Sequence, residues 1–289
     1  MVDEPHPSLS ISARWSERLL LPALWGCGLV GMTLPLGIMG YMLWNGIAVL
    51  GAEFLLGEPA GMPLGSAGGI GPAFLGSAAL AGLALLIAFP LGLGGAVFLT
   101  EFGGNTRLGR ALQFMIECLA AVPAIVYGLF GYAVFVVLLK WRLSLLSGTL
   151  TLALMMYPVI LLGSRTALAA IEAHYREAAL AMGVSRWYVL RKVLLPLAWP
   201  GIVSSAVLSA GHAAGAAAPV LFTACVFFAR GAPSLSDPVM TLPTHLYFLV
   251  NEAVSFPHAY GTASVLIIAM LSGNACAMLI RRWHADHRK

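Results

Sequence analysis

Long apolar stretches separated by short charged segments run through the whole chain. Six stretches without Asp, Glu, Lys or Arg reach the roughly 20 residues that an α-helix needs to cross a bilayer, namely Leu19–Ala52, Pro59–Thr100, Cys118–Leu139, Leu143–Ser164, Val193–Ala229 and Ala253–Ile280. The second stretch opens with a run rich in Gly and Pro, which favours a loop, so we expect its helix to begin near Ala73. The pattern predicts an all-α, polytopic membrane protein with six transmembrane helices.

The residue composition agrees with a membrane protein and excludes several other classes. Of the 289 residues, 60% are hydrophobic and only 10% are charged, whereas about 25% is usual in soluble proteins. So few charges cannot cover a water-facing surface, which excludes a soluble enzyme, a disordered chain and a nucleic-acid-binding protein despite the net charge of +4. Membrane lipids are expected partners, and no nucleic acid is expected.

The basic residues are distributed unevenly between the two sides of the membrane. If the N-terminus is cytoplasmic, that side carries 13 Lys and Arg residues, and the other side carries only Lys140, Arg142 and Arg230. Positive charge is enriched in cytoplasmic segments, so both termini are predicted to be cytoplasmic. Arg14 and Arg18 precede an apolar run about twice as long as the hydrophobic region of a cleavable signal peptide, which favours a retained first span.

Motifs for catalysis, nucleotide binding or metal binding are missing from the sequence. A Walker A loop requires Gly-Lys followed by Ser or Thr, but Lys140, Lys192 and Lys289 follow Leu, Arg and Arg. The four cysteines are far apart, and His284 and His287 have no third ligand nearby, which favours a solvated tail over a metal site. We therefore expect neither catalysis nor a bound metal or cofactor in this chain.

The connection between the fourth and fifth spans, residues 165–192, has the pattern of a helix, a turn and a second helix. Residues 175–182 favour a helix, and Gly183 offers a break. Ser185 can cap a second helix that runs into Val193.

Two explanations account for this segment when its residues are taken alone. The small side chains of Ala178 and Ala179, with Glu177 beside them, give a flat face that fits closely against another protein. The charges and the periodicity alone favour the other explanation, an amphipathic helix that lies on the membrane interface.

The spacing of residues in this connection resembles the EAA loop of ABC importer permeases. The family pattern E-A-A-x3-G-x9-I-x-L-P matches Glu177, Ala178, Ala179, Gly183 and, with Val in place of Ile, Val193–Pro196. In that family the loop forms a coupling helix that fits a cleft in a separate ATPase subunit. The resemblance therefore implies that Glu177, Ala178, Ala179 and Gly183 couple this chain to an ATPase dimer, which binds the ATP and Mg.

Further segments narrow the resemblance to phosphate importer permeases of the PstA type. The similar segments are Val122–Gly131, Arg165–Thr166, Tyr175–Gly183, Ala218–Ala224 and Thr241–Tyr247. The resemblance covers about residues 80–282 and implies a type I ABC importer bundle in the bacterial inner membrane. It also implies two further partners, a second homologous permease and an extracytoplasmic phosphate-binding protein.

The fifth span departs from the family pattern A-R-x-x-G-E-T-A-P. The Arg position is His212 and the Glu position is Ala216, and their spacing predicts neighbouring turns of one helix face. Either His212 packs among small helix neighbours, or it contacts substrate. The resemblance implies a substrate path lined by His212, Gly215, Pro219 and Arg165, in which the ionic pair of the family has been replaced as a unit.

The predicted function is the permease subunit of an ATP-driven importer for inorganic phosphate. The expected organisation is a cytoplasmic tail (1–18), a transmembrane permease domain (19–282) with a coupling loop at about 165–192 and an outer loop at about 230–252, and a basic cytoplasmic tail (283–289). The changes at His212 and Ala216 leave two alternatives open. One is a permease for another oxyanion such as molybdate, tungstate or sulfate, and the other is a non-transporting membrane scaffold for phosphate signalling.

Overall fold

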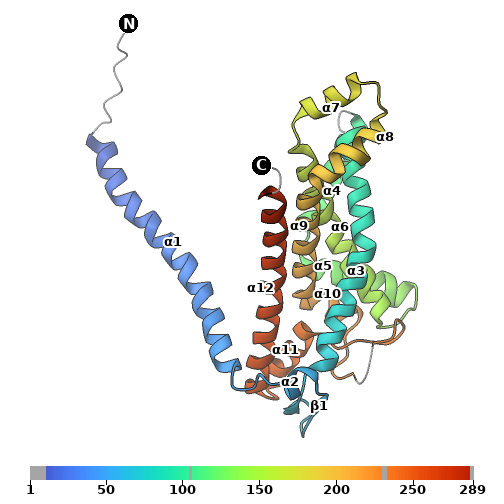
Figure 1. Cartoon of the computed structure of the whole chain (residues 1–289). Helices are drawn as coiled ribbons and strands as arrows, with labels where there is room; N and C mark the ends of the chain where they lie inside the picture. The colour runs from blue at the N-terminus through green and yellow to red at the C-terminus, as the bar shows by residue number, and fades with distance from the viewer. Residues whose placement is uncertain (1–10, 104–105, 230–232, 287–289) are drawn as a thin grey trace.

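The chain folds as a bundle of long helices with one two-stranded hairpin at its lower end (Figure 1). The computed structural model describes residues 11–103, 106–229 and 233–286. The elements in chain order are α1 (Ile11–Gly46), α2 (Ala52–Leu56), β1 (Pro59–Ala60), β2 (Ala67–Gly68), α3 (Gly71–Val97), the π-helical η1 (Phe98–Gly103), α4 (Arg107–Ala120), α5 (Ala124–Gly131), the π-helical η2 (Tyr132–Leu138), α6 (Leu145–Ala169), α7 (Ala173–Ala181), α8 (Arg186–Val189), the π-helical η3 (Leu190–Leu194), α9 (Leu195–Ala214), α10 (Ala217–Thr223), α11 (Leu242–Asn251) and α12 (Phe256–Asp286).

Five helical segments are long and apolar enough to cross a membrane: Leu20–Gly46, Gly71–Gly103, Leu145–Ala169, Arg186–Ala214 and Phe256–Leu279. A sixth span arises if α4 and the α5–η2 segment are counted together. The predicted all-α class is confirmed, and α3 begins at Gly71, close to the expected Ala73. The expectation of six spans holds only with that sixth, bent segment included.

Two of the predicted spans are wrong in shape. The third, expected as one helix over Cys118–Leu139, is bent by 98° between α4 and the α5–η2 segment. The break follows from Pro123, which lacks a backbone N–H and precedes α5 as its N-cap. The fifth, expected to reach Ala229, ends at Ala214, because Gly215 and the extended residue Ala216 separate α9 from the short helix α10.

Helix α6 lies at the centre of the bundle and is the most buried of the five spanning segments. It packs against α3 and α9 along lines of small residues. A Cβ atom on Gly92 of α3 would lie only 2.8 Å from Ile160 Cγ2, and one on Gly201 of α9 would lie 2.6 Å from Ala167 Cβ. Small residues allow helix backbones in a membrane to approach closely, which is a main source of their packing energy.

Two further clusters close the ends of the bundle. At the end that carries α7 and α8, here called the loop end, Leu161, Leu168, Leu190, Leu194 and Ile202 form a buried cluster. At the opposite end, here called the hairpin end because β1 and β2 lie there, a second cluster includes the buried side chains Phe54, Ile70, Ala73, Met240, Leu242 and Val265. Side chains from several elements therefore hold each end of the bundle together.

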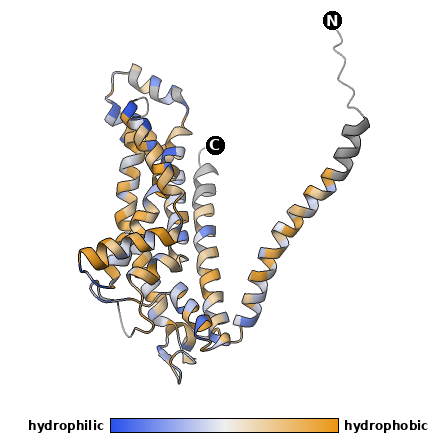
Figure 2. Ribbon diagram, turned by 180° about the vertical axis from the view of Figure 1, so that it is seen from behind, coloured by the Kyte–Doolittle hydropathy of each residue, from blue (hydrophilic) through white to orange (hydrophobic). Residues whose placement is uncertain are grey.

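Helix α1 leaves the bundle and contacts it near the hairpin end (Figures 1 and 2). The contacts are made with α12, where Ser264 Oγ donates a hydrogen bond to the Met42 carbonyl over 3.1 Å and the rings of Tyr41 and Tyr260 meet at 5.9 Å. In the most apolar part of its span Leu20–Gly46, none of the described residues is buried against the rest of the chain. The helix therefore presents apolar side chains to whatever surrounds the bundle.

The α3–α6 contact gives a direct test of the packing. We expect Gly92→Ala to destabilise the protein by about 1–3 kcal/mol, because the added methyl group overpacks a filled interface. Gly94→Ala is the matched control on the same helix, since a Cβ there meets nothing within 4 Å; it should be neutral or slightly stabilising. Thermal unfolding in detergent measures both, and equal midpoints for the two variants would contradict the packing described.

Candidate functional site

The predicted coupling segment forms the loop end of the molecule. Helix α7 carries Glu177 and Ala178 with exposed side chains, while Ala179 is half-buried and packs against the cluster of the loop end. Gly183 follows with a φ of +77°, a conformation that side chains with a Cβ rarely adopt. The sequence therefore predicted the position of the turn correctly.

A capped helix follows the turn, as the sequence predicted. The Ser185 side chain accepts a hydrogen bond from Tyr188 N over 3.2 Å and begins α8. Helix α8 continues through η3 into α9 without a gap in the chain. Val189, Leu190 and Leu194 on this continuous segment are buried in the cluster of the loop end.

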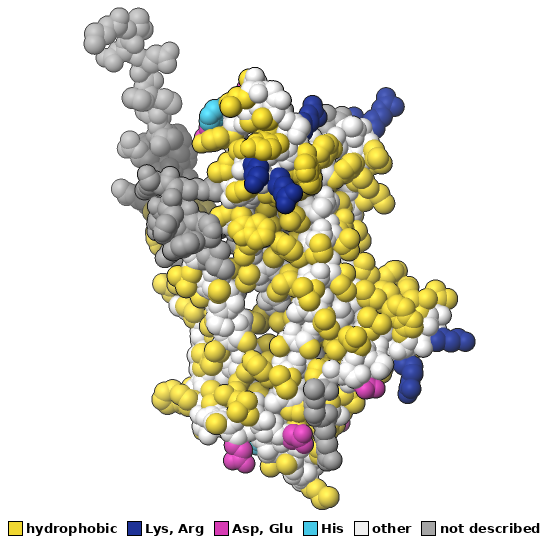
Figure 3. All heavy atoms as spheres, turned by 45° about the vertical axis from the view of Figure 1, so that its right-hand side comes forward, with side chains coloured by type: hydrophobic (Ala, Val, Ile, Leu, Met, Phe, Trp, Pro, Cys, Tyr) yellow, Lys and Arg dark blue, Asp and Glu magenta, His cyan; other side chains and the backbone are white. Residues whose placement is uncertain are grey.

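The exposed side of this segment combines apolar, aromatic and basic side chains. Met182 at the turn is 82% exposed, and Trp187 and Tyr188 also face outward. Arg186, Arg191 and Lys192 are exposed beside them. Figure 3 shows most of the visible Lys and Arg at this end of the molecule, two more low on one flank, and most of the visible Asp and Glu toward the opposite end. A solvated surface with Trp, Tyr and Met beside charges is typical of a protein interface.

The residues predicted to line the substrate path do not come together in one place. Helices α6 and α9 run antiparallel, since Gly163 faces Ser205 and Ser209 Oγ donates to the Met156 carbonyl over 3.4 Å. Arg165 is half-buried near the loop end of α6, nine residues beyond Met156, which is about 13 Å along a helix. It is therefore separated from the break that follows α9.

The other three predicted residues lie at or next to that break. The His212 side chain is exposed, Gly215 caps α9, and Pro219 is buried in α10. A Cβ on Gly128 of α5 would lie 2.8 Å from Pro219 Cα, so two of the family-like segments pack directly against each other. On the other side of the break, a Cβ on Gly215 would meet Met270 Cε of α12 at 2.9 Å.

The expected pairing of His212 and Ala216 on one helix face is wrong. Helix α9 ends at Ala214, and Ala216 has extended backbone angles of −81° and 98°. Ala216 lines a very small, partly open pocket with Ala213 and with the hydroxyl residues Ser77 and Thr241, whereas the His212 side chain is exposed. Spacing along the sequence predicts a shared face only inside an unbroken helix.

Sequence reasoning missed a cluster of buried polar side chains under α11. Thr241 and Thr244 form a capping box at its N-terminus, and Ser77 Oγ of α3 accepts a hydrogen bond from Leu242 N over 2.8 Å. His245 lies 3.3 Å from Thr262 Oγ1. Burial, together with nearby His258, lowers the pKa of His245 to about 4, so the ring is neutral at pH 7. The cluster thus holds α11 against α3 and α12 without adding a charge.

Sequence reasoning also missed the amphipathic helix α4. Its polar side carries Arg110, Gln113 and Glu117, with Gln113 Nε2 donating to Glu117 Oε1 over 2.7 Å. Ile116 is buried on the opposite side. The 3.6-residue period of these positions was the available signal. The third span was predicted to begin at Cys118, which lies close to the end of α4, so most of this helix was left outside the prediction.

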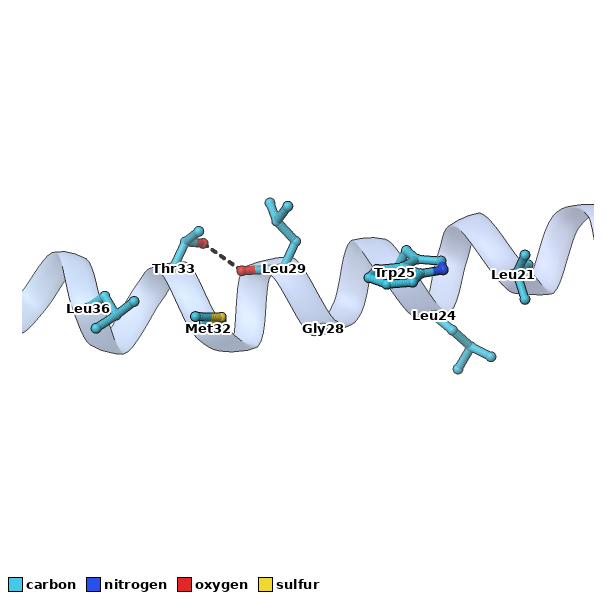
Figure 4. A pocket seen from close by; sticks show the side chains of 8 residues that line it. All are labelled: Leu21, Leu24, Trp25, Gly28, Leu29, Met32, Thr33 and Leu36. Atoms are coloured by element: carbon cyan, nitrogen blue, oxygen red, sulfur yellow. Dashed lines mark hydrogen bonds between the residues drawn. The ribbon is translucent and has the colours of Figure 1, made fainter. Parts of the chain in front are cut away.

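No candidate metal site is found in the described ranges 11–103, 106–229 and 233–286. These ranges hold no group of three or more His, Cys, Asp or Glu suited to a metal ion; His287 of the predicted solvated tail lies outside them. A hollow along α1 is lined by residues of that helix alone (Figure 4). Thr33, the one hydroxyl residue there, donates to the Leu29 carbonyl over 2.8 Å, so the surface is apolar and suits lipid or another helix.

Comparison with known sequences identifies relatives over most of the chain. The chain is 32% identical over 273 residues to the probable ABC transporter permease protein YqgI of Bacillus subtilis, covering 89% of this chain and 90% of that protein. It is 34% identical over 222 residues to the phosphate transport system permease protein PstA 1 of Mycobacterium tuberculosis, covering 76% and 73%. It is 31% identical over 224 residues to PstA of Xylella fastidiosa, covering 74% and 76%.

Solved structures of ABC importers share the fold. The inward-facing MetNI methionine ABC transporter matches with a TM-score of 0.60 and 20% identity, over 72% of this chain and 92% of that chain. A bacterial ABC transporter involved in the import of alginate matches with a TM-score of 0.60 and 14% identity, over 93% and 98%. At the sequence level, residues 88–288 match the family model described as binding-protein-dependent transport system inner membrane component. The chain therefore belongs to this family of ABC transporter permeases and has the type I importer fold.

Proposed function

We propose that this chain is the permease subunit of an ATP-driven importer for inorganic phosphate and forms half of the translocation path. The observation that carries the proposal is the similarity to PstA permeases of phosphate transport systems over about three quarters of the chain. The coupling segment and the helix break after α9 both fall inside the region that matches the family.

The proposed role of the loop end is to couple this chain to a separate ATPase dimer. Glu177, Ala178 and Ala179 on α7 offer an acidic residue and a flat face, and Gly183 sets the direction of the chain after them. The ATPase dimer binds the ATP and Mg, and this chain is not itself an enzyme. In support, the exposed aromatic and basic side chains of α8 extend the same surface.

The proposed mechanism is alternating access driven from the loop end. ATP-driven closure of the ATPase dimer moves α7 and α8, and these are joined to α6 and α9 by a continuous chain and a shared buried cluster. Packed clusters move as units because interiors resist continuous deformation. The motion therefore tilts the helices that flank the substrate path, which opens outward and then relaxes.

The proposed assembly lies in the bacterial inner membrane with both termini in the cytoplasm. The loop end faces the cytoplasm because the Lys and Arg residues concentrate there. The partners are a second homologous permease, the ATPase dimer, an extracytoplasmic phosphate-binding protein and membrane lipids. The permease domain over residues 19–282, with its coupling loop at about 165–192, is the unit that these partners contact.

Ala216 favours one second candidate, a permease for another oxyanion such as molybdate, tungstate or sulfate. An Ala at the position where the family pattern has Glu leaves the small pocket beside it without a charge, lined by apolar side chains and by the hydroxyl residues Ser77 and Thr241. A change of charge inside a substrate path alters which anion is favoured.

Uptake by the reconstituted complex tests the proposed substrate. Proteoliposomes that contain this chain, its partner permease, the ATPase and the binding protein should accumulate radiolabelled phosphate only with ATP. Unlabelled phosphate should compete, whereas molybdate and sulfate should not. Uptake of labelled molybdate or sulfate without uptake of phosphate would make that oxyanion the substrate, and ATPase activity without any uptake would favour the signalling scaffold.

Substitutions at Gly183 and Glu177 test the coupling role. Gly183→Val should lower transport about tenfold, since a left-handed conformation costs a β-branched residue about 1–2 kcal/mol. Gly183→Asn is the matched control and should retain transport, because Asn tolerates this conformation and nothing lies within 4 Å of the added Cβ. Glu177→Lys should uncouple ATP hydrolysis from uptake, whereas Glu172→Lys on the same loop should not.

Failure of this pattern has a clear meaning. If Gly183→Val and Glu177→Lys both transport like the parent chain, then α7 is an interfacial helix and not the coupling element.

The broken end of α9 predicts that positions 212 and 216 act independently. Ala216→Glu should impair uptake because the carboxylate enters a pocket with few polar groups, and His212→Arg should not restore it. The two effects should add within about 0.5 kcal/mol in a double-mutant cycle on uptake. Recovery of activity in the double variant would revive the pairing expected from the sequence.

A further inference from the structure

The hairpin of β1 and β2 is a compact, internally bonded projection at the hairpin end (Figure 1). Pro59 pairs with Gly68 and Ala60 with Ala67. Gly65 N donates to the Ala60 carbonyl over 2.9 Å, and Ser66 N donates to the Pro63 carbonyl over 3.0 Å. The turn between the strands therefore has a defined shape of its own.

The base of this hairpin is locked to the core. Ile70, just after β2, is fully buried, and its N–H donates to the Phe54 carbonyl over 2.7 Å. A Cβ on Gly65 would lie 3.1 Å from Phe228 Cζ and 3.5 Å from Leu249 Cδ2, so the turn also rests on α11 and the segment before it. A surface held in this way loses little conformational freedom when a partner binds it.

The tip of the hairpin exposes an apolar side chain in an ordered turn. Met62 is 99% exposed, Leu56 at the end of α2 is 81% exposed, and Leu64 is also exposed. Exposed apolar side chains that gather on one surface mark interaction sites, whereas single ones do not, and these three lie on one short segment, residues 56–64. Met is also a side chain that adapts to the shape of a partner surface.

Acidic side chains surround this tip and indicate the nature of the partner. Glu53 and Glu58 flank the hairpin, and Glu252 follows α11, whose Leu249 contacts the turn; all three carboxylates are exposed. Carboxylates are costly to move from water into the hydrocarbon of a bilayer, which disfavours insertion of the tip into the membrane. A protein surface with basic groups around an apolar depression is complementary to it.

We propose that the β1–β2 hairpin, with Met62 at its tip, is the docking element for the extracytoplasmic binding protein. This inference rests on the proposed function, because it requires that the hairpin end faces away from the cytoplasm and that a binding protein delivers the anion. The alginate ABC transporter that shares the fold was solved in complex with a periplasmic protein. The hairpin lies directly against α11, and the polar cluster joins the N-terminal part of α11 to α3 and α12. A displacement of the hairpin on docking is therefore passed to the bundle through few contacts.

Stimulation of ATP hydrolysis measures the docking. The reconstituted transporter is titrated with purified, phosphate-loaded binding protein, and the concentration that gives half-maximal stimulation is compared between variants. Met62→Asp should raise this concentration about tenfold, as expected for a central apolar anchor. Glu58→Lys should raise it about threefold, with an effect that shrinks at high salt. Leu235→Ser is the matched control, an exposed apolar residue outside the hairpin, and should behave like the parent chain.

A labelling experiment separates the binding protein from lipid as the occupant. Cysteine introduced as Met62→Cys into a cysteine-free chain should react with a membrane-impermeant maleimide in intact cells that lack the binding protein. Adding the binding protein should slow this reaction at least about tenfold, while Leu235→Cys should keep its rate. Lack of reaction without the binding protein would place the tip in the membrane and overturn the proposal.

Failure of the docking proposal can be told apart from failure of the proposed function. If the parent chain is stimulated by its binding protein and Met62→Asp has the same half-maximal concentration, the hairpin does not dock it. If stimulation requires a molybdate- or sulfate-loaded protein and Met62→Asp still weakens it, the hairpin is supported and phosphate is rejected. Absence of stimulation of the parent chain by any oxyanion-loaded protein would overturn both.

Discussion

Close approach of helix backbones around α6 is the contact on which the rest of the structure depends. Lipid chains are as apolar as Leu, so hydrophobic burial does not drive helices together inside a membrane, and packing between small residues does. Gly92 of α3, Gly131 of α5 and Gly201 of α9 each leave no room for a Cβ beside α6. Three elements therefore meet one central helix at short range.

Two of the buried hydroxyl residues of α6 are compatible with this burial because they bond to carbonyls nearby in the chain. Thr151 Oγ1 donates to the Ser147 carbonyl over 2.8 Å, and Ser147 Oγ donates to the Arg142 carbonyl over 3.1 Å. A buried hydroxyl with a local acceptor avoids most of the cost of leaving water. Small residues with hydrogen-bond acceptors nearby in the chain let α6 occupy the centre of the bundle. The position of α6 in turn determines where Arg165 and the break after α9 lie along the bundle.

The features that the sequence predicted depend on local chemistry. Span positions follow from apolar length, the Gly183 turn follows from the lack of a Cβ, and the start of α8 follows from the Ser185 hydroxyl. The bend at Pro123 could also have been predicted, since proline lacks the N–H that a continuous helix needs. The absence of charged residues does not reveal this bend, because the apolar run continues through it.

Other features depend on contacts between distant segments and could not be predicted from local patterns. Nothing in the apolar run Leu19–Ala52 specifies that α1 diverges from the bundle, because this depends on where Gly46 meets Ser264 of α12. The β1–β2 hairpin sits in a stretch predicted only as a loop, since strands of two residues carry no periodic signal. Its position is set by Phe54, Ile70 and Phe228 in the cluster of the hairpin end.

The end of α9 changes how a departure from a family pattern is interpreted. The sequence pattern alone treats His212 and Ala216 as one unit. In the structure the His212 side chain is exposed, whereas Ala216 lines a small pocket. A substitution at the pocket position is limited by the desolvation of whatever enters that pocket, since few polar groups line it. A substitution at the outward position meets no such cost within this chain, because the His212 side chain is exposed. The departures from the family pattern at His212 and Ala216 are therefore two separate changes under different physical constraints.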